Sequence, residues 1–515
     1  MHNHELLTSR RDMLALLAAA GATTLAGAAQ AATPRKGGRI KVAGATAALS
    51  DTLDPAKGSN HTDYIRAYML YNGLTQLDAS LTPQPSLAES FASKDARTWV
   101  FKLRQGVTFH DGKPFGPADV VFSLMRHKDP STGSKAKALA EQIEEAKATG
   151  PHEVTVRLAA PNADLPAILG TSHFLIVRDG ITDVNAHMAG VGTGPYKLKE
   201  FKPGVRSVVV RNENYWKPNK PYLDEIEYVG IGDEAARVNA LLTGEIDLTM
   251  AINPRSVDRI KGSAKHAIFE TKAGVYTDLI MRRDSGPGAN PDFVLAMKHL
   301  FNREQMVKSI LLGYGEVAND HPIHPSNRFH FKGLKQRAYD LDKAKWHAQK
   351  ANLGSSPIPV VVSPAATNSV EMALVMQHAA KQVGLNLDVR RMPADGYWSQ
   401  HWMKHPVGFG NINPRPSADA LLTQFFKSDA PWNEAGWKNP KFDQLLVAAR
   451  AQTDVARRAQ MYADMQTLIH EDGGIGIPFF MSSIDGHSKR LKGLASIPLG
   501  GLMGYQFAEN VWLEA

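Results

Sequence analysis

The segment between residues 359 and 389 constrains the fold more than any other part of this 515-residue chain. It begins with Pro359-Val-Val-Val-Ser, continues into a periodic apolar stretch from about 370 to 383, and ends in Leu385-Asn-Leu-Asp-Val after Gly384. A strand, a helix stopped by glycine and a second strand in this order predict a right-handed crossover between parallel strands. We therefore expect an α/β fold.

Similar patterns recur along the rest of the chain. Alternating apolar residues predict further strands at residues 39–43, 99–103, 154–158 and 226–229 and around Val208. Helical spacing follows Pro117 and Pro291 and returns at residues 442–450 and 455–470. The length predicts about three structural units. Because no repeat and no low-complexity linker separates them, we expect the domains to share strands.

The composition excludes several classes of protein. The chain has no cysteine, which removes disulfides, thiolate metal sites, cysteine nucleophiles and lipid attachment through an N-terminal cysteine. The formal charge of +8 comes from 59 basic and 51 acidic residues, and the basic residues occur singly or in pairs. No run resembles a nucleic-acid-binding arm, so we expect no nucleic-acid partner.

Residues 1–31 have the three parts of a removable export signal. A polar head ends in Arg10-Arg11, a mildly apolar middle follows, and a small-residue site is found at Ala29-Gln30-Ala31. The arginine pair resembles a twin-arginine signal, although it could also be the positive head of an ordinary secretory signal. No later segment reaches the ~18 apolar residues of a membrane helix. We expect a soluble periplasmic protein without a lipid anchor, not embedded in the membrane.

The motifs of common enzymes are missing from the sequence. The glycines of Gly190-Val-Gly-Thr-Gly-Pro-Tyr lack the GxGxxG spacing, and the residues that follow do not read as a helix that could hold a phosphate. No Walker lysine, HExxH or GxSxG occurs. We predict no catalytic residues and no cofactor. A hydrolase built from scattered acids remains an alternative.

A metal or metallophore carrier is the other alternative. His401 and His405 lie four residues apart on a predicted helix and could bind a metal ion. Trp398 and Trp402 share that helix, however, and no carboxylate has the usual spacing, so we predict no metal site.

Several motifs in a fixed order resemble a known family. The most specific is Trp99-Val-Phe-Lys-Leu-Arg-Gln-Gly-Val-Thr-Phe-His-Asp-Gly-Lys-Pro-Phe, which runs on to Ala118-Asp-Val-Val-Phe-Ser-Leu. Others are Leu53-Asp-Pro, Gly192-Thr-Gly-Pro-Tyr, Arg211-Asn-Glu-Asn-Tyr-Trp and Asn439-Pro-Lys-Phe-Asp. Over residues 38–480, roughly, the chain resembles the extracytoplasmic solute-binding proteins of ABC importers, family 5, the dipeptide/oligopeptide/nickel-binding class.

The resemblance implies a two-lobed periplasmic-binding-protein clamp that closes on its ligand by a hinge. Lobe I would comprise residues 34–80, 190–275 and 484–515, with an extra subdomain at 81–189, and lobe II residues 276–483. The partners would be an inner-membrane ABC permease and a small polar organic ligand such as a short peptide or an opine-like amino-acid conjugate. The receptor would act as a monomer.

The resemblance also indicates where the ligand would be held. Residues 407–421 match a family segment rich in ligand contacts, with Asn413, Arg415 and Asp419 kept and Ile412 in place of a tryptophan. Arg415 occupies the neighbourhood where peptide binders commonly have an aspartate for the ligand amine. An arginine there suits a carboxylate or a phosphate, or it could pair with Asp419 to brace the loop. The predicted ligand contacts are Tyr64, Tyr276, Tyr397, Trp398, Trp402, Phe409, Asn411, Asn413, Arg415 and Asp419.

Overall fold

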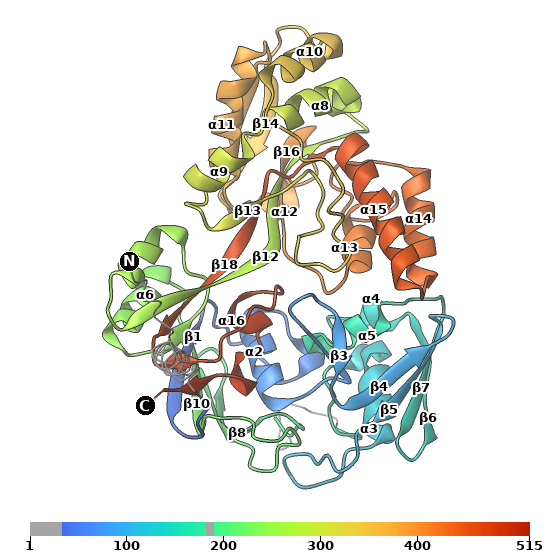
Figure 1. The fold of residues 1–515 in the computed structure, drawn as a ribbon, viewed down its shortest axis with the longest axis vertical. Helices are drawn as coiled ribbons and strands as arrows, with labels where there is room; N and C mark the ends of the chain where they lie inside the picture. The colour runs from blue at the N-terminus through green and yellow to red at the C-terminus, as the bar shows by residue number, and fades with distance from the viewer. Residues whose placement is uncertain (1–32, 182–189, 515) are drawn as a thin grey trace, which may run out of the picture.

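Figure 1 shows the computed structural model, which describes residues 33–181 and 190–514. The predicted export signal lies outside the described residues. The molecule has a lower body and an upper body, which we call the first lobe and the second lobe. Two long strands, β12 (His266–Met281) and β18 (Phe479–Ser488), run from one lobe to the other. The α/β class and the two lobes agree with the expectation from the sequence.

The first lobe contains most of a mixed sheet. Strand β1 (Arg39–Gly44) pairs in parallel with β10 (Glu225–Gly230) and β11 (Leu248–Thr249), and β9 (Arg206–Arg211) and β8 (Tyr196–Lys202) continue the sheet in antiparallel fashion. The apolar residues that alternate along these strands are buried against helix α2 and the C-terminal segment. This packing holds α2 (His61–Leu70) within the first lobe, where Figure 1 draws it just below α16 (Gly501–Gly504).

A separate antiparallel sheet lies beside it. Its order is β4 (Ala88–Ser93), β5 (Thr98–Leu103), β7 (Glu153–Leu158) and β6 (Ile143–Gly150). Helix α3 (Pro117–Met125) packs on this sheet through Val120 and Leu124, as its periodicity predicts. The sheet and the helix enclose a hydrophobic core of their own.

The second lobe contains the strand–helix–strand unit that the sequence predicts. Strands β14 (Ile358–Val362) and β15 (Leu387–Arg391) pair in parallel, and α11 (Ser369–Gln382) connects them. Strand β16 (Val407–Ile412) pairs with the upper part of β12. The longer of its other helices are α8 (Pro291–His299), α10 (Leu341–Ala351), α14 (Pro440–Ala451) and α15 (Val455–Asp472).

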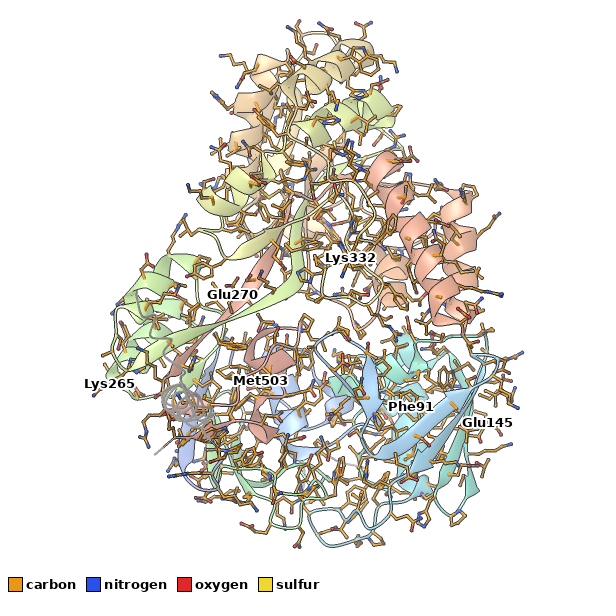
Figure 2. All side chains as sticks on the ribbon, in the orientation of Figure 1. Phe91, Glu145, Lys265, Glu270, Lys332 and Met503 are labelled. Atoms are coloured by element: carbon orange, nitrogen blue, oxygen red, sulfur yellow. The ribbon has the colours of Figure 1, made fainter. Side chains whose placement is uncertain are left out.

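The two lobes share one sheet. Strands β12 and β18 pair along most of their length, and their register shifts between Lys272 and Val275. Figure 2 places Glu270 on the part of β12 that leaves the first lobe, just before this shift. An irregularity in a two-stranded connection is a natural place for the lobes to rotate relative to each other.

The glycines at 192 and 194 serve packing and not phosphate binding. An added Cβ would lie 2.0 Å from the Leu70 carbonyl oxygen at Gly192 and 2.3 Å from the Leu70 carbonyl carbon at Gly194. Strand β8 begins two residues later, so no helix follows the glycines, as the sequence analysis expects. The backbone therefore needs glycine here to approach the end of α2.

None of the helices within residues 33–181 and 190–514 combines the length and the apolar character needed to cross a bilayer.

Candidate functional site

The lobes contact each other through buried charges at one end of their boundary. Asp164 of the first lobe lies 2.8 Å from a guanidinium nitrogen of Arg458 and 3.8 Å from one of Arg328, both in the second lobe. The backbone N–H of Ala163 also donates to the carbonyl oxygen of Arg450 at 2.8 Å. Since Asp164 and Arg458 are both buried, these contacts exclude water. The structure thus shows the lobes closed on each other at this end.

Arg415 lies in the loop between β16 and α13 (Ala418–Phe425). Its Nε donates to Gln424 Oε1 at 2.6 Å, and one terminal nitrogen donates to the carbonyl oxygen of Asn413 at 2.9 Å. The guanidinium carbon is 5.1 Å from the centre of the Phe425 ring, a cation–π contact. These contacts fix the orientation of the guanidinium group without neutralising its charge.

The titratable neighbours of Arg415 are two tyrosines, which are neutral near pH 7. Burial lowers the pKa of Arg415, and the hydroxyls of Tyr276 and Tyr64 act in the opposite direction. Tyr64 belongs to the first lobe, so Arg415 faces across the boundary between the lobes. Tyr276 is buried, and within the described part of the chain its hydroxyl has no hydrogen-bond partner. A half-buried guanidinium with no carboxylate among these neighbours is suited to an anionic ligand.

Asp419 does not take part in this arrangement. Its carboxylate pairs with Arg450, whose Nε lies 3.1 Å from Oδ1. Burial raises the pKa of Asp419 to about 6, and the Arg450 guanidinium opposes that rise. Asp419 pairs with Arg450 and not with Arg415, so it does not brace Arg415. Asp419 as a ligand contact stays a prediction.

Aromatic rings extend from Arg415 in a continuous row. The ring centres are 5.5 Å apart between Phe425 and Trp432, 6.2 Å between Trp432 and Trp402, and 5.7 Å between Trp402 and Trp398. We call these four residues the aromatic row. Trp432 is 39% exposed and Trp398 is 42% exposed, so the row offers apolar surface to a ligand. The predicted contacts Trp398, Trp402 and Arg415 thus come together, and the sequence analysis did not single out Phe425.

Four other predicted contacts have different surroundings. Tyr397 is buried in the core of the second lobe, and its hydroxyl donates to the carbonyl oxygen of Phe409, which is equally buried. Asn411 donates to Thr277 Oγ1 at 2.9 Å. Only Asn413 is exposed. In this structure Tyr397 and Phe409 are buried in the core of the second lobe. Their role as ligand contacts stays a prediction.

The first lobe contributes a second group of rings. Tyr64 on α2 has its ring centre 5.7 Å from Tyr505 and 5.3 Å from His173, and His61 stacks on Tyr505 at 5.4 Å. The sequence analysis includes Tyr64 but misses Tyr505, which is more than 400 residues away in the chain. The one sequence feature that could have drawn attention to Tyr505 is the glycine-rich run around residues 500–504.

A strained turn carries Tyr505. Leu502, Met503 and Tyr505 have φ angles of 54°, 58° and 74°, in the left-handed region that residues other than glycine rarely adopt. The buried carboxylate of Asp485 accepts a hydrogen bond from the Leu502 N–H at 2.6 Å. Figure 2 shows Met503 on the side of the first lobe that faces the second lobe. The strain is thus located at the lobe boundary, where Tyr505 meets Tyr64.

His401 and His405 lie side by side in the second lobe, but not on one helix. Helix α12 spans only Tyr397–Gln400, so the predicted helix carrying His401 and His405 is wrong. Nδ1 of His401 lies 3.2 Å from Nε2 of His405, and the two rings are stacked. Among the described residues, no group of three or more His, Cys, Asp or Glu side chains could hold a metal ion.

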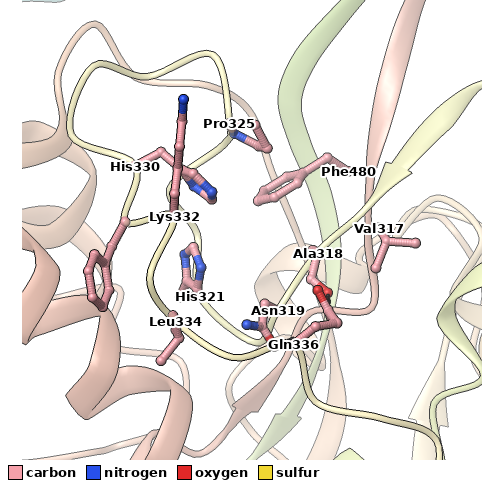
Figure 3. Close-up of a pocket in the computed structure, with 11 residues that line it drawn as sticks. Val317, Ala318, Asn319, His321, Pro325, His330, Lys332, Leu334, Gln336 and Phe480 are labelled. Atoms are coloured by element: carbon pink, nitrogen blue, oxygen red, sulfur yellow. Dashed lines mark hydrogen bonds between the residues drawn. The ribbon is translucent and has the colours of Figure 1, made fainter.

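A polar cavity of about 310 Å³ opens beside the predicted site in the second lobe. Figure 3 shows His321, His330 and Lys332 on one side of it and Phe480 on the other. Burial lowers the pKa of His321 to about 3, so its ring is neutral near pH 7. The Phe480 ring is 6.1 Å from that of Tyr276, and the cavity therefore adjoins the site.

Comparison with known proteins agrees with this geometry. Residues 82–434 match the model of the bacterial extracellular solute-binding proteins, family 5. The chain is 26% identical over 464 residues to the glutathione-binding protein GsiB of Escherichia coli O6:K15:H31, covering 87% of this chain and 90% of that one.

Two solved structures show the same fold. The periplasmic binding protein DppA of Helicobacter pylori, in complex with the peptide STSA, superposes with a TM-score of 0.74 and 23% identity, covering 93% of this chain and 99% of that one. The substrate-binding protein CtaP of Listeria monocytogenes gives a TM-score of 0.82 and 19% identity, covering 93% and 100%. None of the three names describes an enzyme. The chain belongs to the bacterial extracellular solute-binding proteins of family 5, the receptors that deliver ligands to the permeases of ABC importers.

Proposed function

We propose that this receptor captures a small polar organic ligand with an anionic group, such as a short peptide or an amino-acid conjugate. The anion would contact Arg415, the body of the ligand would lie along the aromatic row, and Tyr64 would cover it from the first lobe. The observation that carries the proposal is Arg415, a half-buried guanidinium held by neutral groups. Relatives named for glutathione and bound to a peptide support this ligand class.

The remaining expectations belong to the same proposal. The mature chain would be periplasmic, exported by the twin-arginine signal of residues 1–31, free of a lipid anchor and monomeric. Lobe I would comprise residues 34–80, 190–275 and 484–515 with the subdomain 81–189, and lobe II residues 276–483. The ligand would be released unchanged, without a cofactor.

The experiment identifies the ligand and then tests Arg415. Mass spectrometry of whatever co-purifies with the native protein gives the ligand, and calorimetry measures its affinity for Arg415→Ala. Loss of charge-assisted hydrogen bonds predicts a weakening by about 1.5–3 kcal/mol, roughly ten- to hundredfold in Kd. The melting temperature of the ligand-free variant should change little, because the lost contacts are with neutral groups.

Arg391→Ala is the matched control. Arg391 is exposed at the end of β15, in the same lobe, and its loss should leave the affinity unchanged. Intact affinity in Arg415→Ala together with a large loss of stability would show that Arg415 is a structural brace. Conversion of the ligand to a product would contradict the transport role.

A further inference from the structure

Two carboxyl groups lie together behind Trp402, in the interior of the second lobe. Asp278, near the C-terminal end of β12, is 0% exposed, and Glu434 is 4% exposed. Both lie against the backbone of Gly410 in β16. An added Cβ at Gly410 would be 2.1 Å from Glu434 Oε1 and 2.7 Å from Asp278 Oδ1. The absence of a side chain at Gly410 makes room for the pair.

The pair lacks the partners that buried carboxylates require. Within residues 33–181 and 190–514, neither oxygen of Asp278 has an N–H or O–H donor. Glu434 Oε1 accepts a hydrogen bond from Trp402 Nε1 at 2.5 Å. Two ionised carboxylates side by side in a dry interior repel each other and lose their hydration. A single proton shared between Asp278 and Glu434 would satisfy the oxygens that have no other donor.

The groups around the pair offer no compensating positive charge. Tyr276, two residues along β12, and Tyr397 both have their pKa values raised by burial, and the two carboxyls raise them further. The positive charge of Arg415 lowers the pKa of Tyr276. Among residues 33–181 and 190–514, no cationic side chain contributes to the pKa shifts of Asp278 and Glu434, so a proton is left to balance the pair.

We propose that Asp278 and Glu434 hold one proton between them and that this protonated pair positions the Trp402 ring in the aromatic row. The consequence for ligand binding rests on the proposed function, in which the row contacts the ligand. Asp278 and Glu434 are positioning residues, because the contact that they make is with Trp402.

The direction of the pH dependence follows from the environment. Burial raises the pKa of Asp278 to about 7, and burial and the Asp278 charge raise that of Glu434 well above its usual range. When the shared proton leaves, two adjacent negative charges push Glu434 away from its place and release the indole. The folded protein also holds this proton more tightly than the unfolded chain, so stability falls as pH rises from about 4 to about 7.

The test follows the Trp402 indole in the ligand-free protein. Nitrogen-15 NMR resolves the indole N–H signals, and the signal missing in Trp402→Phe belongs to Trp402. We expect this signal to shift between pH 5 and pH 9 with one midpoint in the wild type. The signal should not shift with pH in the double variant Asp278→Asn/Glu434→Gln, because the two amides have nearly the same shape as the carboxyl groups but share no titrating proton.

Asp485→Asn is the matched control. Asp485 is another buried carboxyl whose pKa burial raises to about 7, but it lies in the first lobe beside Leu502. In this variant the Trp402 indole signal should shift with pH as it does in the wild type. A Trp402 signal that does not move in the wild type, or that moves equally in the double variant, overturns the proposal.

Affinity for glutathione as a probe tests the link to binding. It should fall about five-fold from pH 6 to pH 8 in the wild type, the loss expected for one displaced aromatic contact, and stay level in the double variant. A titrating indole with unchanged affinity overturns the link to binding. If glutathione fails to bind at every pH, that result counts against the choice of ligand in the proposed function, while the indole signal still tests the pair.

Discussion

At the scale of single residues, Gly410 explains why the second lobe can bury two acids beside a tryptophan. Strand β16 has a second glycine, Gly408, which provides a direct comparison. An alanine at Gly408 would find its nearest neighbour, the Val361 carbonyl oxygen, at 3.5 Å, an ordinary contact. The same change at Gly410 would overlap Glu434. Glycine is therefore required at position 410, whereas position 408 of the same strand can accept an alanine.

Gly410→Ala should destabilise the protein by about 1–3 kcal/mol, because the added methyl group forces Glu434 out of place. The Trp402 indole signal should move as well. Gly408→Ala should change both readouts little. Urea denaturation of the two variants measures the difference, and equal stabilities would contradict the packing around Gly410.

Residues also show how far the sequence could predict the site. Arg415, Trp398 and Trp402 were predicted from the family resemblance, and the structure brings them together in one row. Tyr397 and Phe409 were predicted on the same grounds, and their burial could not be predicted because a segment pattern does not tell which face of a strand or turn meets the solvent. The pairing of Asp419 could not be predicted because its partner, Arg450, follows 31 residues later.

At the scale of secondary-structure elements, the regular segments followed from the sequence and the irregular ones did not. The strand–helix–strand unit of β14, α11 and β15 has the predicted order and parallel pairing. The helix predicted through His401 and His405 ends at Gln400 instead. The turn at residues 500–505 was not predicted, because three of its positive-φ residues, Leu502, Met503 and Tyr505, are not glycines, and Leu502 is held by a hydrogen bond to Asp485.

Asp485→Ala should loosen this turn. The variant loses the acceptor for the Leu502 N–H, and we expect a loss of about 1–3 kcal/mol in stability together with weaker ligand binding through Tyr505. Asp485→Asn keeps an oxygen acceptor and should retain most of the stability and most of the ligand affinity. Calorimetry measures the ligand affinity, and denaturation measures the free energy of unfolding. Ligand affinity in Asp485→Ala equal to the wild type would show that the turn plays no part in binding.

At the scale of the whole molecule, the closed arrangement depends on charges that meet only when the lobes touch. Burial opposes the ionisation of Asp164, but the Arg458 and Arg328 guanidinium groups outweigh it and hold the pKa of Asp164 below its usual range. Its contribution to closure is thus present above about pH 4 and is lost as pH falls below that value. An arrangement of this kind stabilises the closed clamp without contacting the ligand.

Asp164→Asn should weaken ligand binding by roughly tenfold, mainly through faster release, because it leaves the Arg458 charge buried and unpaired in the closed state alone. The matched control is Glu144→Gln, which removes an exposed pair with Arg157 inside the first lobe and should have no effect. Stopped-flow release kinetics distinguish the two variants. Equal release rates for Asp164→Asn and the wild type would contradict the role of this contact.

The central claim is that two lobes joined by β12 and β18 close on an unaltered ligand. Small-angle X-ray scattering of the ligand-free protein and of the same sample saturated with the ligand that co-purifies tests it most directly. The account predicts a smaller radius of gyration with ligand and full recovery of the open profile after dialysis. Superimposable profiles at saturation, with binding confirmed by calorimetry, would contradict it.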